Sequence, residues 1–398
     1  MQKIKWGIIG PGSIANAFAH SIKHSQNSEL TGVFGRTKAK TNNFAQLFNI
    51  QSFGSLQDFL SSKDIDAVYV ATPHSDHFLY SLEAIKHHKH VLCEKPLTMN
   101  AHESMILLDL AHSLKVFLME AYMYRVHPQT LNILNHLSLF DESNEKILIE
   151  GSFGFKAEVS SDHRLRDPLL GGGAILDVGC YPLSMCKLIA GHLQDLPFAE
   201  PKSISAAGRL DKTGVDLQSD AHLIFSDQIE AKISCAIDEQ LPNKLVISNS
   251  DITIAVSDPW HCGQFHEGKS SIFVNHVSGS IEEISFDDQV GLFTREIEHA
   301  SSCILNHKIE SDFISHGDTQ SNMFWLDQWR QQMQIVCPKD LIKNSPILES
   351  KAFLNQTSEL ENIAIPGLNK LASRLALGCD NQTSEVHAFT MFDNFYGS

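Results

Sequence analysis

Three side chains in this sequence have the chemistry to hold or move a proton. Lys95 stands between Glu94 and Pro96 at the end of an apolar run, and Asp177 and Tyr181 follow three consecutive glycines. Because they are four residues apart, Asp177 and Tyr181 share one face of a helix. That spacing fits proton-transfer chemistry, and it fits equally well a buried, hydrogen-bonded tyrosine beside a solvated aspartate. The elements around these residues must show whether the side chains meet.

Short apolar runs alternate with amphipathic stretches over the first third of the chain. The apolar runs cover 4–10, 30–35, 66–72, 90–96 and 116–121, and the amphipathic stretches between them cover 13–24, 39–48, 76–88 and 101–114. A strand followed by a helix, repeated in this way, predicts a doubly wound parallel sheet, which is the Rossmann arrangement. We therefore expect residues 1–122 to form an α/β domain.

The pattern changes after residue 145. Apolar runs at 146–155, 221–227, 229–237, 244–249 and 251–257 follow one another with mostly turns between them, which favours a mainly antiparallel open sheet. Helical patterns at 174–190, 292–306 and 318–333 complete an α+β domain, which we place at 123–338. A polar stretch at 339–366 is typical of a linker, and 367–398 holds one further apolar run and one helical pattern.

Charge and cysteine usage argue against several classes of partner. With 47 acidic against 31 basic residues the net charge is −16, which disfavours nucleic acid and anionic membrane surfaces. We see no signal peptide, and no stretch that approaches the roughly 20 apolar residues of a membrane span. The eight cysteines form no C-x-x-C pair, and none of the 21 histidines lies in H-E-x-x-H. We expect a reduced, cytoplasmic protein without a metal site.

The first apolar run leads into GPGSIA at residues 10–15, a G-x-G-x-x-A turn that opens a helix. Glycines at Gly10 and Gly12 permit a tight turn and a close backbone approach, and the helix N-terminus offers free N–H groups to a pyrophosphate. The same glycines could serve a purely structural turn. Their position at the first strand–helix junction favours dinucleotide binding.

The second apolar run ends in Gly35-Arg36-Thr37, without the acidic residue that would bind the ribose 2′-hydroxyl of NAD. A basic residue at this place suits the 2′-phosphate of NADP. We therefore expect NADP, with NAD possible, and Lys40 is a candidate second contact. The alternative is a solvated surface arginine.

Lys95 follows a predicted strand directly, and Thr72-Pro73 follows the neighbouring one. In a doubly wound sheet ligands bind beyond the carboxyl ends of the strands, so Lys95 is delivered to the place that the cofactor occupies. Pro96 restricts the backbone of Lys95. A solvated lysine is the alternative. The residues that we expect to bind the cofactor are Gly10, Gly12, Ser13, Ile14, Arg36, Thr37, Thr72, Pro73, His77, Glu94 and Lys95.

Five motifs together resemble the glucose–fructose oxidoreductase, inositol dehydrogenase and rhizopine-catabolism (Gfo/Idh/MocA) family. They are GPGSIA, ATPHSDH (71–77), CEKP (93–96), EAYMYRVHP (120–128) and GGGAILDVGCYPL (171–183). The resemblance covers roughly residues 3–338. Tyr181, where many relatives carry His, is similar to the branch of dimeric dihydrodiol dehydrogenases and NADP-linked xylose dehydrogenases.

The resemblance implies reversible hydride transfer between a nicotinamide and the hydroxyl or carbonyl carbon of a sugar, a sugar derivative or a trans-diol. It implies that Lys95 lies beside the nicotinamide and that the helix with Asp177 and Tyr181 faces the substrate. Tyr181 is then the candidate general acid/base, with its usual pKa near 10 lowered by Lys95. Asp177 would orient one of these groups or bind a substrate hydroxyl. Lys95 and Tyr181 could also exchange roles.

The resemblance further implies that the open sheet of the second domain forms a homodimer. Other polar groups could meet a polyhydroxylated substrate or be solvated: Tyr124, Arg125, His127, Arg164, Arg166 and Asp167. We expect the glycines at 171–173 to give a flexible, uncrowded entry to the helix.

Two other functions use the same fold. A cofactor-sensing regulator would bind the dinucleotide without catalysis, and a glycoside-cleaving enzyme would oxidise its substrate transiently with no net change in NAD(P)H. The regulator predicts loss of Lys95, Asp177 or Tyr181, and all three are present. The segment from 368 onward resembles the opening of an aldo/keto reductase barrel, which suggests a fragment of a longer fused protein, because such a barrel needs about 250 residues.

Overall fold

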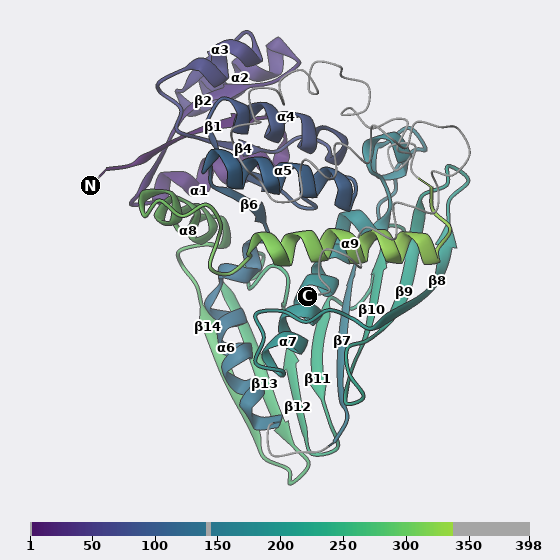
Figure 1. Cartoon of the computed structure of the whole chain (residues 1–398). Coiled ribbons are helices and arrows are strands. Elements are labelled where there is room, and N and C mark those ends of the chain that lie inside the picture. Colours follow the sequence, from purple (N-terminus) through teal and green to yellow (C-terminus); the bar gives the residue numbers. More distant parts are fainter. Residues whose placement is uncertain (1, 141–144, 337–398) are drawn as a thin grey trace. The chain divides into compact units, whose positions relative to one another are not determined.

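The computed structural model describes residues 2–140 and 145–336, all within one compact unit, Met1–Asp340 (Figure 1). The predicted linker at 339–366 and the barrel-like tail at 367–398 lie outside the described residues. The division between residues 122 and 123 remains a prediction.

Six parallel strands form the sheet of residues 2–140, in the order β3-β2-β1-β4-β5-β6. The strands are β1 (Ile4–Ile9), β2 (Ser28–Phe34), β3 (Gln51–Phe53), β4 (Ala67–Val70), β5 (His90–Glu94) and β6 (Leu118–Ala121). The helices between them are α1 (Ser13–Ser21), α2 (Lys38–Phe48), α3 (Leu56–Ser61), α4 (His74–Lys86) and α5 (Ala101–Leu114). The predicted doubly wound sheet is confirmed. It places the carboxyl end of β1 between those of β2 and β4.

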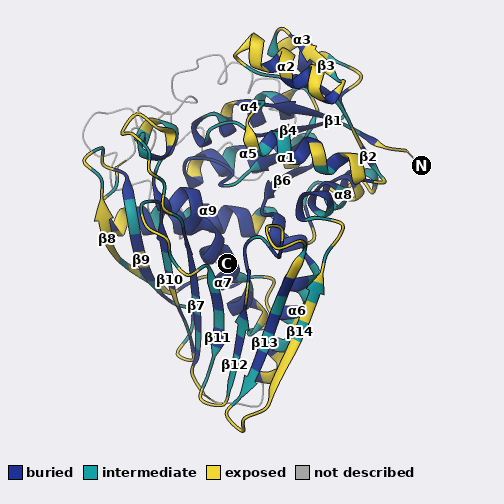
Figure 2. Ribbon diagram, turned by 180° about the vertical axis from the view of Figure 1, so that it is seen from behind, coloured by how far each residue is buried: buried dark blue, intermediate teal, exposed yellow. Residues whose placement is uncertain are grey.

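Eight strands form the sheet of residues 145–336, in the order β14-β13-β12-β11-β7-β10-β9-β8. They are β7 (Ile147–Gly154), β8 (Ser203–Leu210), β9 (Asp216–Ile224), β10 (Ile229–Ala236), β11 (Lys244–Ser248), β12 (Ile252–Val256), β13 (Lys269–His276) and β14 (Ile281–Asp287). Only β7 and β10 pair in parallel among these strands. The expectation of a mainly antiparallel sheet is confirmed, and the edge strands β8 and β14 carry many exposed residues (Figure 2).

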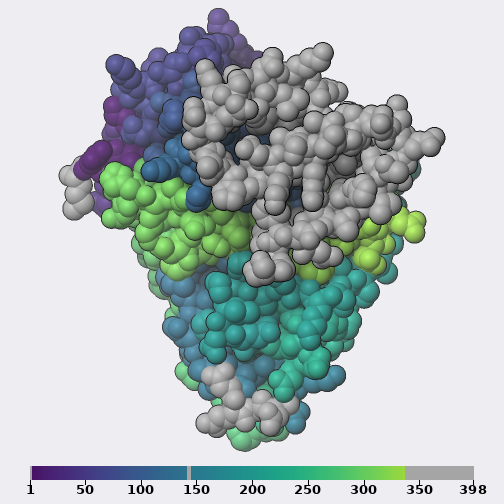
Figure 3. All heavy atoms as spheres, viewed as in Figure 1, coloured from purple at the N-terminus to yellow at the C-terminus, as the bar shows by residue number. Residues whose placement is uncertain are grey.

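Four longer helices complete the described part of the chain. They are α6 (Pro128–His136), α7 (Cys180–His192), α8 (Leu292–Leu305) and α9 (His316–Gln332). Helix α9 packs on α5, α7 and β8. Helix α8 returns to the N-terminal part of the chain and packs on α1, β1 and β2, and its green surface lies beside the purple N-terminal segment in Figure 3. The indole of Trp6 donates a hydrogen bond to Ser301 Oγ on this helix at 2.9 Å. A helix from the far end of the described chain therefore packs both on the first sheet and on the turn Met123–Val126 that follows it.

The helix that carries Asp177 and Tyr181 begins in a different form from the one expected. Residues Ile175–Gly179 form a π-helix, which continues directly as α7. The helical stretch Pro168–His192 is also long and apolar enough to span a membrane by length and composition, contrary to the expectation that no stretch comes close. However, 83% of its most apolar window is buried inside the protein, as in a core helix.

The glycines before this helix are crowded, so the expected flexible and uncrowded entry is wrong. Gly173 has φ +111°, and a Cβ added there would lie 2.2 Å from Asp216 Oδ1. A Cβ on Gly171 would lie 2.6 Å from Met99 Sδ. Asp216 Oδ2 accepts a hydrogen bond from the backbone N–H of Ile175 at 2.6 Å, which satisfies one of the free N–H groups at the start of the helix. The glycines let this carboxylate reach the start of the helix.

A cluster of three buried charged side chains connects α7, α9 and the turn Met123–Val126. Asp318 on α9 pairs with Arg125 at 2.7 Å and with Lys187 on α7 at 3.5 Å. The three side chains are 3% exposed or less. Burial lowers the pKa of Lys187, and the charge of Asp318 opposes that shift. Removing the shared carboxylate would leave two cations in the core.

We expect Asp318→Ala to destabilise the protein by about 3 kcal/mol or more, because uncompensated buried charges are costly. The free energy of unfolding from urea titration measures the loss. The control is Asp312→Ala, which removes an acid from an exposed pair with Lys308 and should cost far less, because solvent screens the pair. Equal losses in the two variants would contradict a role for the buried cluster.

Gly173→Ala should also destabilise the protein, by about 2 kcal/mol or more, since the new Cβ meets Asp216 and φ is positive. Gly54→Ala serves as the matched control, because a Cβ there has nothing within 4 Å and its φ is not positive. Thermal unfolding of both variants measures the difference, and a stable Gly173→Ala protein would show that the loop can rearrange.

Candidate functional site

The turn after β1 has the features of an anion site. Gly10 has φ +96°, and a Cβ there would lie 2.8 Å from the carbonyl oxygen of Ala71 at the end of β4. Gly12 is the N-cap of α1, with open space where its side chain would be, no side-chain cap and no acid in the first turn. Among the described residues, the backbone N–H groups of Ser13 and Ile14 have no acceptor. An uncapped helix N-terminus of this kind fits a pyrophosphate.

The neighbouring strand ends supply the other expected cofactor residues. Arg36 follows β2 with its side chain 68% exposed, and Thr37 is the N-cap of α2. Thr72 follows β4, and its hydroxyl oxygen is buried without a hydrogen-bond partner in the described part of the chain. A buried hydroxyl without a partner is unusual and points to a missing ligand. The free N–H groups and this hydroxyl fit a dinucleotide laid across the end of β1.

Two of the expected cofactor residues are held by the protein itself. The ring nitrogens of His77 lie 2.8 Å from the carbonyl oxygen of Pro96 and 2.9 Å from that of Thr72. Burial lowers the pKa of His77 to about 4. Glu94 accepts a hydrogen bond from the hydroxyl of Tyr69. His77 thus joins the turns after β4 and β5, and Tyr69 anchors Glu94, the residue before Lys95.

Lys95, Asp177 and Tyr181 meet, although they come from different domains of the predicted division. Lys95 Nζ donates a hydrogen bond to the backbone carbonyl of Asp177 at 2.6 Å and lies 4.0 Å from the Asp177 carboxylate. The same nitrogen lies 5.1 Å from the centre of the Tyr181 ring. Both Asp177 and Tyr181 are buried. The end of β5 is therefore tied to the π-helix.

Asp177 has two further neighbours. Arg164 Nη1 lies 3.2 Å from Asp177 Oδ1, and His74 Nε2 lies 3.9 Å from the same oxygen. Burial by itself would raise the pKa of Asp177, but the charges of Lys95 and Arg164 outweigh it and the pKa is lowered. Burial lowers the pKa of His74 to about 3. The carboxylate is thus ionised between two cations and a neutral imidazole at neutral pH.

The expectation that Lys95 lowers the pKa of Tyr181 is wrong for this structure. Burial raises the pKa of Tyr181 well above 10, and the charges of Glu94 and Asp177 raise it further. Lys95 lies over the ring face, where it makes a cation–π contact, and its charge does not offset the effect of burial. Within the described residues the Tyr181 hydroxyl makes no hydrogen bond. It is a neutral phenol with a free donor.

Most other polar groups proposed for the substrate are part of the core. Tyr124 donates a hydrogen bond to the backbone carbonyl of Tyr181 at 3.1 Å, and His127 lies 3.0 Å from Asp288. Arg125 belongs to the buried cluster with Asp318. Tyr124, Arg125 and His127 are therefore not solvated; Tyr124 packs against Tyr181 from within the core.

The charged side chains of residues 164–167, in the loop before the π-helix, contact different partners. Arg166 lies 3.9 Å from Asp211, and the Asp167 carboxylate accepts a hydrogen bond from the Leu169 N–H at 2.9 Å. Arg164 alone of this group reaches Asp177, and its side chain remains 47% exposed. Arg164 is thus the accessible cation of the site.

The sequence patterns did not single out two neighbours of the site. His74 follows Thr72-Pro73 directly, so the strand-end argument that selected those residues could have found it. Tyr122 packs its ring 5.7 Å from that of Tyr181, and its buried hydroxyl lies beside the Cys180 thiol. No spacing signal marks Tyr122, because it lies between β6 and a short helical turn.

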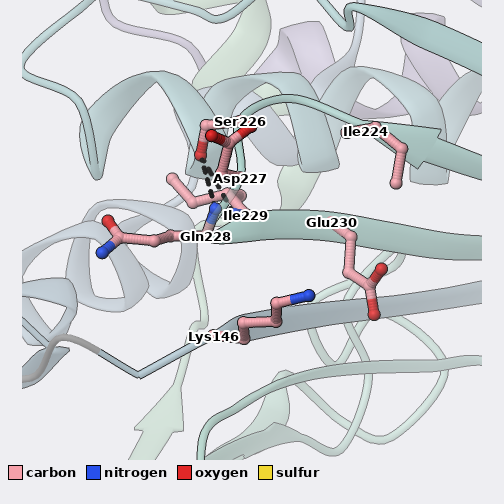
Figure 4. Close-up of a pocket in the computed structure, with 7 residues that line it drawn as sticks. All are labelled: Lys146, Ile224, Ser226, Asp227, Gln228, Ile229 and Glu230. Atoms are coloured by element: carbon pink, nitrogen blue, oxygen red, sulfur yellow. Dashed lines mark hydrogen bonds between the residues drawn. The ribbon is translucent and has the colours of Figure 1, made fainter.

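A shallow depression lies elsewhere, at the turn between β9 and β10 (Figure 4). Its lining consists of Lys146, Ile224, Ser226, Asp227, Gln228, Ile229 and Glu230. The Ser226 hydroxyl accepts hydrogen bonds from the N–H groups of Gln228 and Ile229, so it stabilises the turn. None of the candidate site residues lines this depression.

Two family models match the chain. Residues 4–122 match the oxidoreductase family with an NAD-binding Rossmann fold, and residues 145–255 match the GFO/IDH/MocA C-terminal domain. Trans-1,2-dihydrobenzene-1,2-diol dehydrogenase of Xenopus tropicalis is 31% identical over 344 residues, which cover 84% of this chain and 99% of the relative. The enzyme of the same name from Homo sapiens is 25% identical over 348 residues, with 85% and 99% covered.

Solved structures agree in fold. A 3-ketoreductase from Actinomadura kijaniata, in complex with NADP and TDP-benzene, has a TM-score of 0.73 at 20% identity, covering 83% of this chain and 98% of that one. An aldose–aldose oxidoreductase from Caulobacter crescentus, complexed with glycerol, has a TM-score of 0.72 at 20% identity, covering 84% and 98%. The family models and the relatives thus confirm the resemblance seen in the sequence, and the chain belongs to the Gfo/Idh/MocA family of NAD(P)-binding oxidoreductases.

Proposed function

We propose that this protein is an NADP-preferring dehydrogenase that acts reversibly on a CH–OH group of a small polyhydroxylated substrate. The observation that carries the proposal is the contact of Lys95 with Asp177 and the Tyr181 ring. It places one ammonium group, one carboxylate and one free phenol hydroxyl beyond the carboxyl end of β5, where ligands bind in such sheets.

Gly10, Gly12, Ser13, Ile14 and Thr72 would hold the dinucleotide. When bound, NADP supplies the nicotinamide carbon that gives or takes the hydride. The chain must then manage the substrate oxygen, which gains negative charge when the carbonyl is reduced and needs a proton. Since the pKa of Tyr181 is raised, its hydroxyl serves as a hydrogen-bond donor to that oxygen. Lys95 provides the positive charge and the proton.

Asp177 holds Lys95 in place through its backbone carbonyl and balances its charge through its carboxylate. Arg164, half-exposed beside the same carboxylate, offers further donors to substrate hydroxyls. The relatives named dihydrodiol dehydrogenase and the sugar-active neighbours support a trans-diol, a sugar or a sugar derivative.

The protein is further proposed to be a cytoplasmic homodimer formed through the open sheet, in keeping with the many exposed residues on β8. Fusion to an aldo/keto reductase domain remains a proposal from the sequence after residue 368. The length of the native reading frame tests it.

Tyr181→Phe and Lys95→Ala should each reduce turnover by about 10² to 10⁴, because each removes a donor to the substrate oxygen. Activity is followed at 340 nm with a panel of sugars and diols, and NADPH binding should be retained. Tyr122→Phe is the control, since it removes a buried hydroxyl next to the Tyr181 ring. Near-normal turnover in both site variants would exclude this site.

The pH profile adds a second readout. Because the pKa of Tyr181 is raised well above 10, its ionisation should produce no limb in the wild-type profile of kcat/KM below pH 10.

Steady NADPH formation with any substrate would also exclude the regulator and the glycoside-cleaving enzyme, which show no net turnover of the cofactor.

Arg36→Ala should lower the ratio of kcat/KM for NADP to that for NAD by about tenfold or more, because the 2′-phosphate loses its cation. Steady-state kinetics with both cofactors measure the ratio. A wild-type enzyme that clearly prefers NAD would overturn the assignment of NADP.

A further inference from the structure

An ion pair crosses the end of β1, where the dinucleotide is proposed to lie. Arg36 follows β2, and Asp76 lies in the first turn of α4, after β4. Their charged groups are 3.4 Å apart. Because β2 and β4 flank β1 in the sheet, the pair spans the strand whose turn carries Gly10 and Gly12.

Asp76 lacks the partners that a buried oxygen normally has. Its Oδ2 atom is buried and makes no hydrogen bond within the described residues, and the Arg36 guanidinium is the contact that it does make. The guanidinium is 68% exposed, so solvent weakens this pairing. Thr72 Oγ1, in the connection between β4 and α4, is also buried without a hydrogen-bond partner among the described residues. Buried polar atoms usually have a hydrogen-bond partner. Thr72 Oγ1 and Asp76 Oδ2 are therefore two acceptor atoms that can take a hydrogen bond from a ligand.

NAD and NADP differ in what they offer at this place. The adenosine ribose of NAD carries a 2′-hydroxyl, which can donate a hydrogen bond to a carboxylate. The 2′-phosphate of NADP offers only acceptor oxygens and negative charge, which Asp76 repels. The acid that usually follows β2 in NAD-binding folds is absent here, since Arg36 stands in that region.

We propose that Asp76 is a specificity-determining residue for the cofactor: its carboxylate accepts a hydrogen bond from the adenosine ribose and limits the preference for NADP that Arg36 creates. The first turn of α4 thus supplies the acid that is absent after β2, and both cofactors bind. This inference rests on the proposed function, and in particular on the role of Arg36.

Three variants of the full chain separate the contributions. Asp76→Asn removes the charge and keeps the shape, and Asp76→Ala also removes the acceptor. Glu83→Gln is the control, because Glu83 is an acid on the same helix that pairs with Lys86 at 3.0 Å, two turns further along. Isothermal titration calorimetry gives the Kd for NADP and for NAD without a substrate, and steady-state kinetics give kcat.

In Asp76→Asn, NADP should bind about threefold to tenfold more tightly, because the repulsion of the phosphate is lost. In Asp76→Ala, NAD should bind about threefold or more weakly, because the ribose loses its acceptor. The NADP-to-NAD affinity ratio should rise in both variants and stay within twofold of wild type in Glu83→Gln.

The result that overturns the inference is an unchanged or lowered ratio in both Asp76 variants while Arg36→Ala still lowers it. An unchanged ratio in Arg36→Ala as well would instead refute the proposed 2′-phosphate site. The two failures are therefore distinguishable.

Discussion

One hydrogen bond, from Lys95 Nζ to the backbone carbonyl of Asp177, links the sheet of the first domain to the helix of the second. It places a cation from the end of β5 beside a buried carboxylate and over an aromatic ring. The surroundings support this one contact. His77 fixes the turns after β4 and β5, and Asp216 fixes the start of the π-helix. The chemistry proposed for the site depends on both supports staying rigid.

Much of the fold could be predicted from the sequence, because burial on both faces makes parallel strands nearly continuous apolar runs. The strand β3 has three residues, with only Phe53 buried, so it leaves no run to find. The π-helix was missed because its apolar positions satisfy the α-helical period as well. Helix α8 was predicted correctly as a helix, but periodicity cannot tell which domain a helix covers.

The candidate site, like the fold, could be predicted only in part from the sequence. Lys95, Asp177 and Tyr181 could be selected from strand-end position and helical spacing, and the structure brings them together. The electrostatics could not be predicted, because the pKa of Tyr181 depends on burial and on where the Lys95 nitrogen stands relative to the ring. The crowding at Gly173 likewise depends on Asp216, a residue from a different strand.

The return of α8 to the first domain has a consequence for how the chain is made. Trp6 is fully buried, and its indole donates a hydrogen bond to Ser301 on α8. During synthesis the parallel sheet is therefore made well before α8, which completes the cover of Trp6 beside Phe18 of α1. The parallel sheet thus gains the packing of α8 only after most of the described chain has been made, and apolar surface that is exposed before that point favours aggregation.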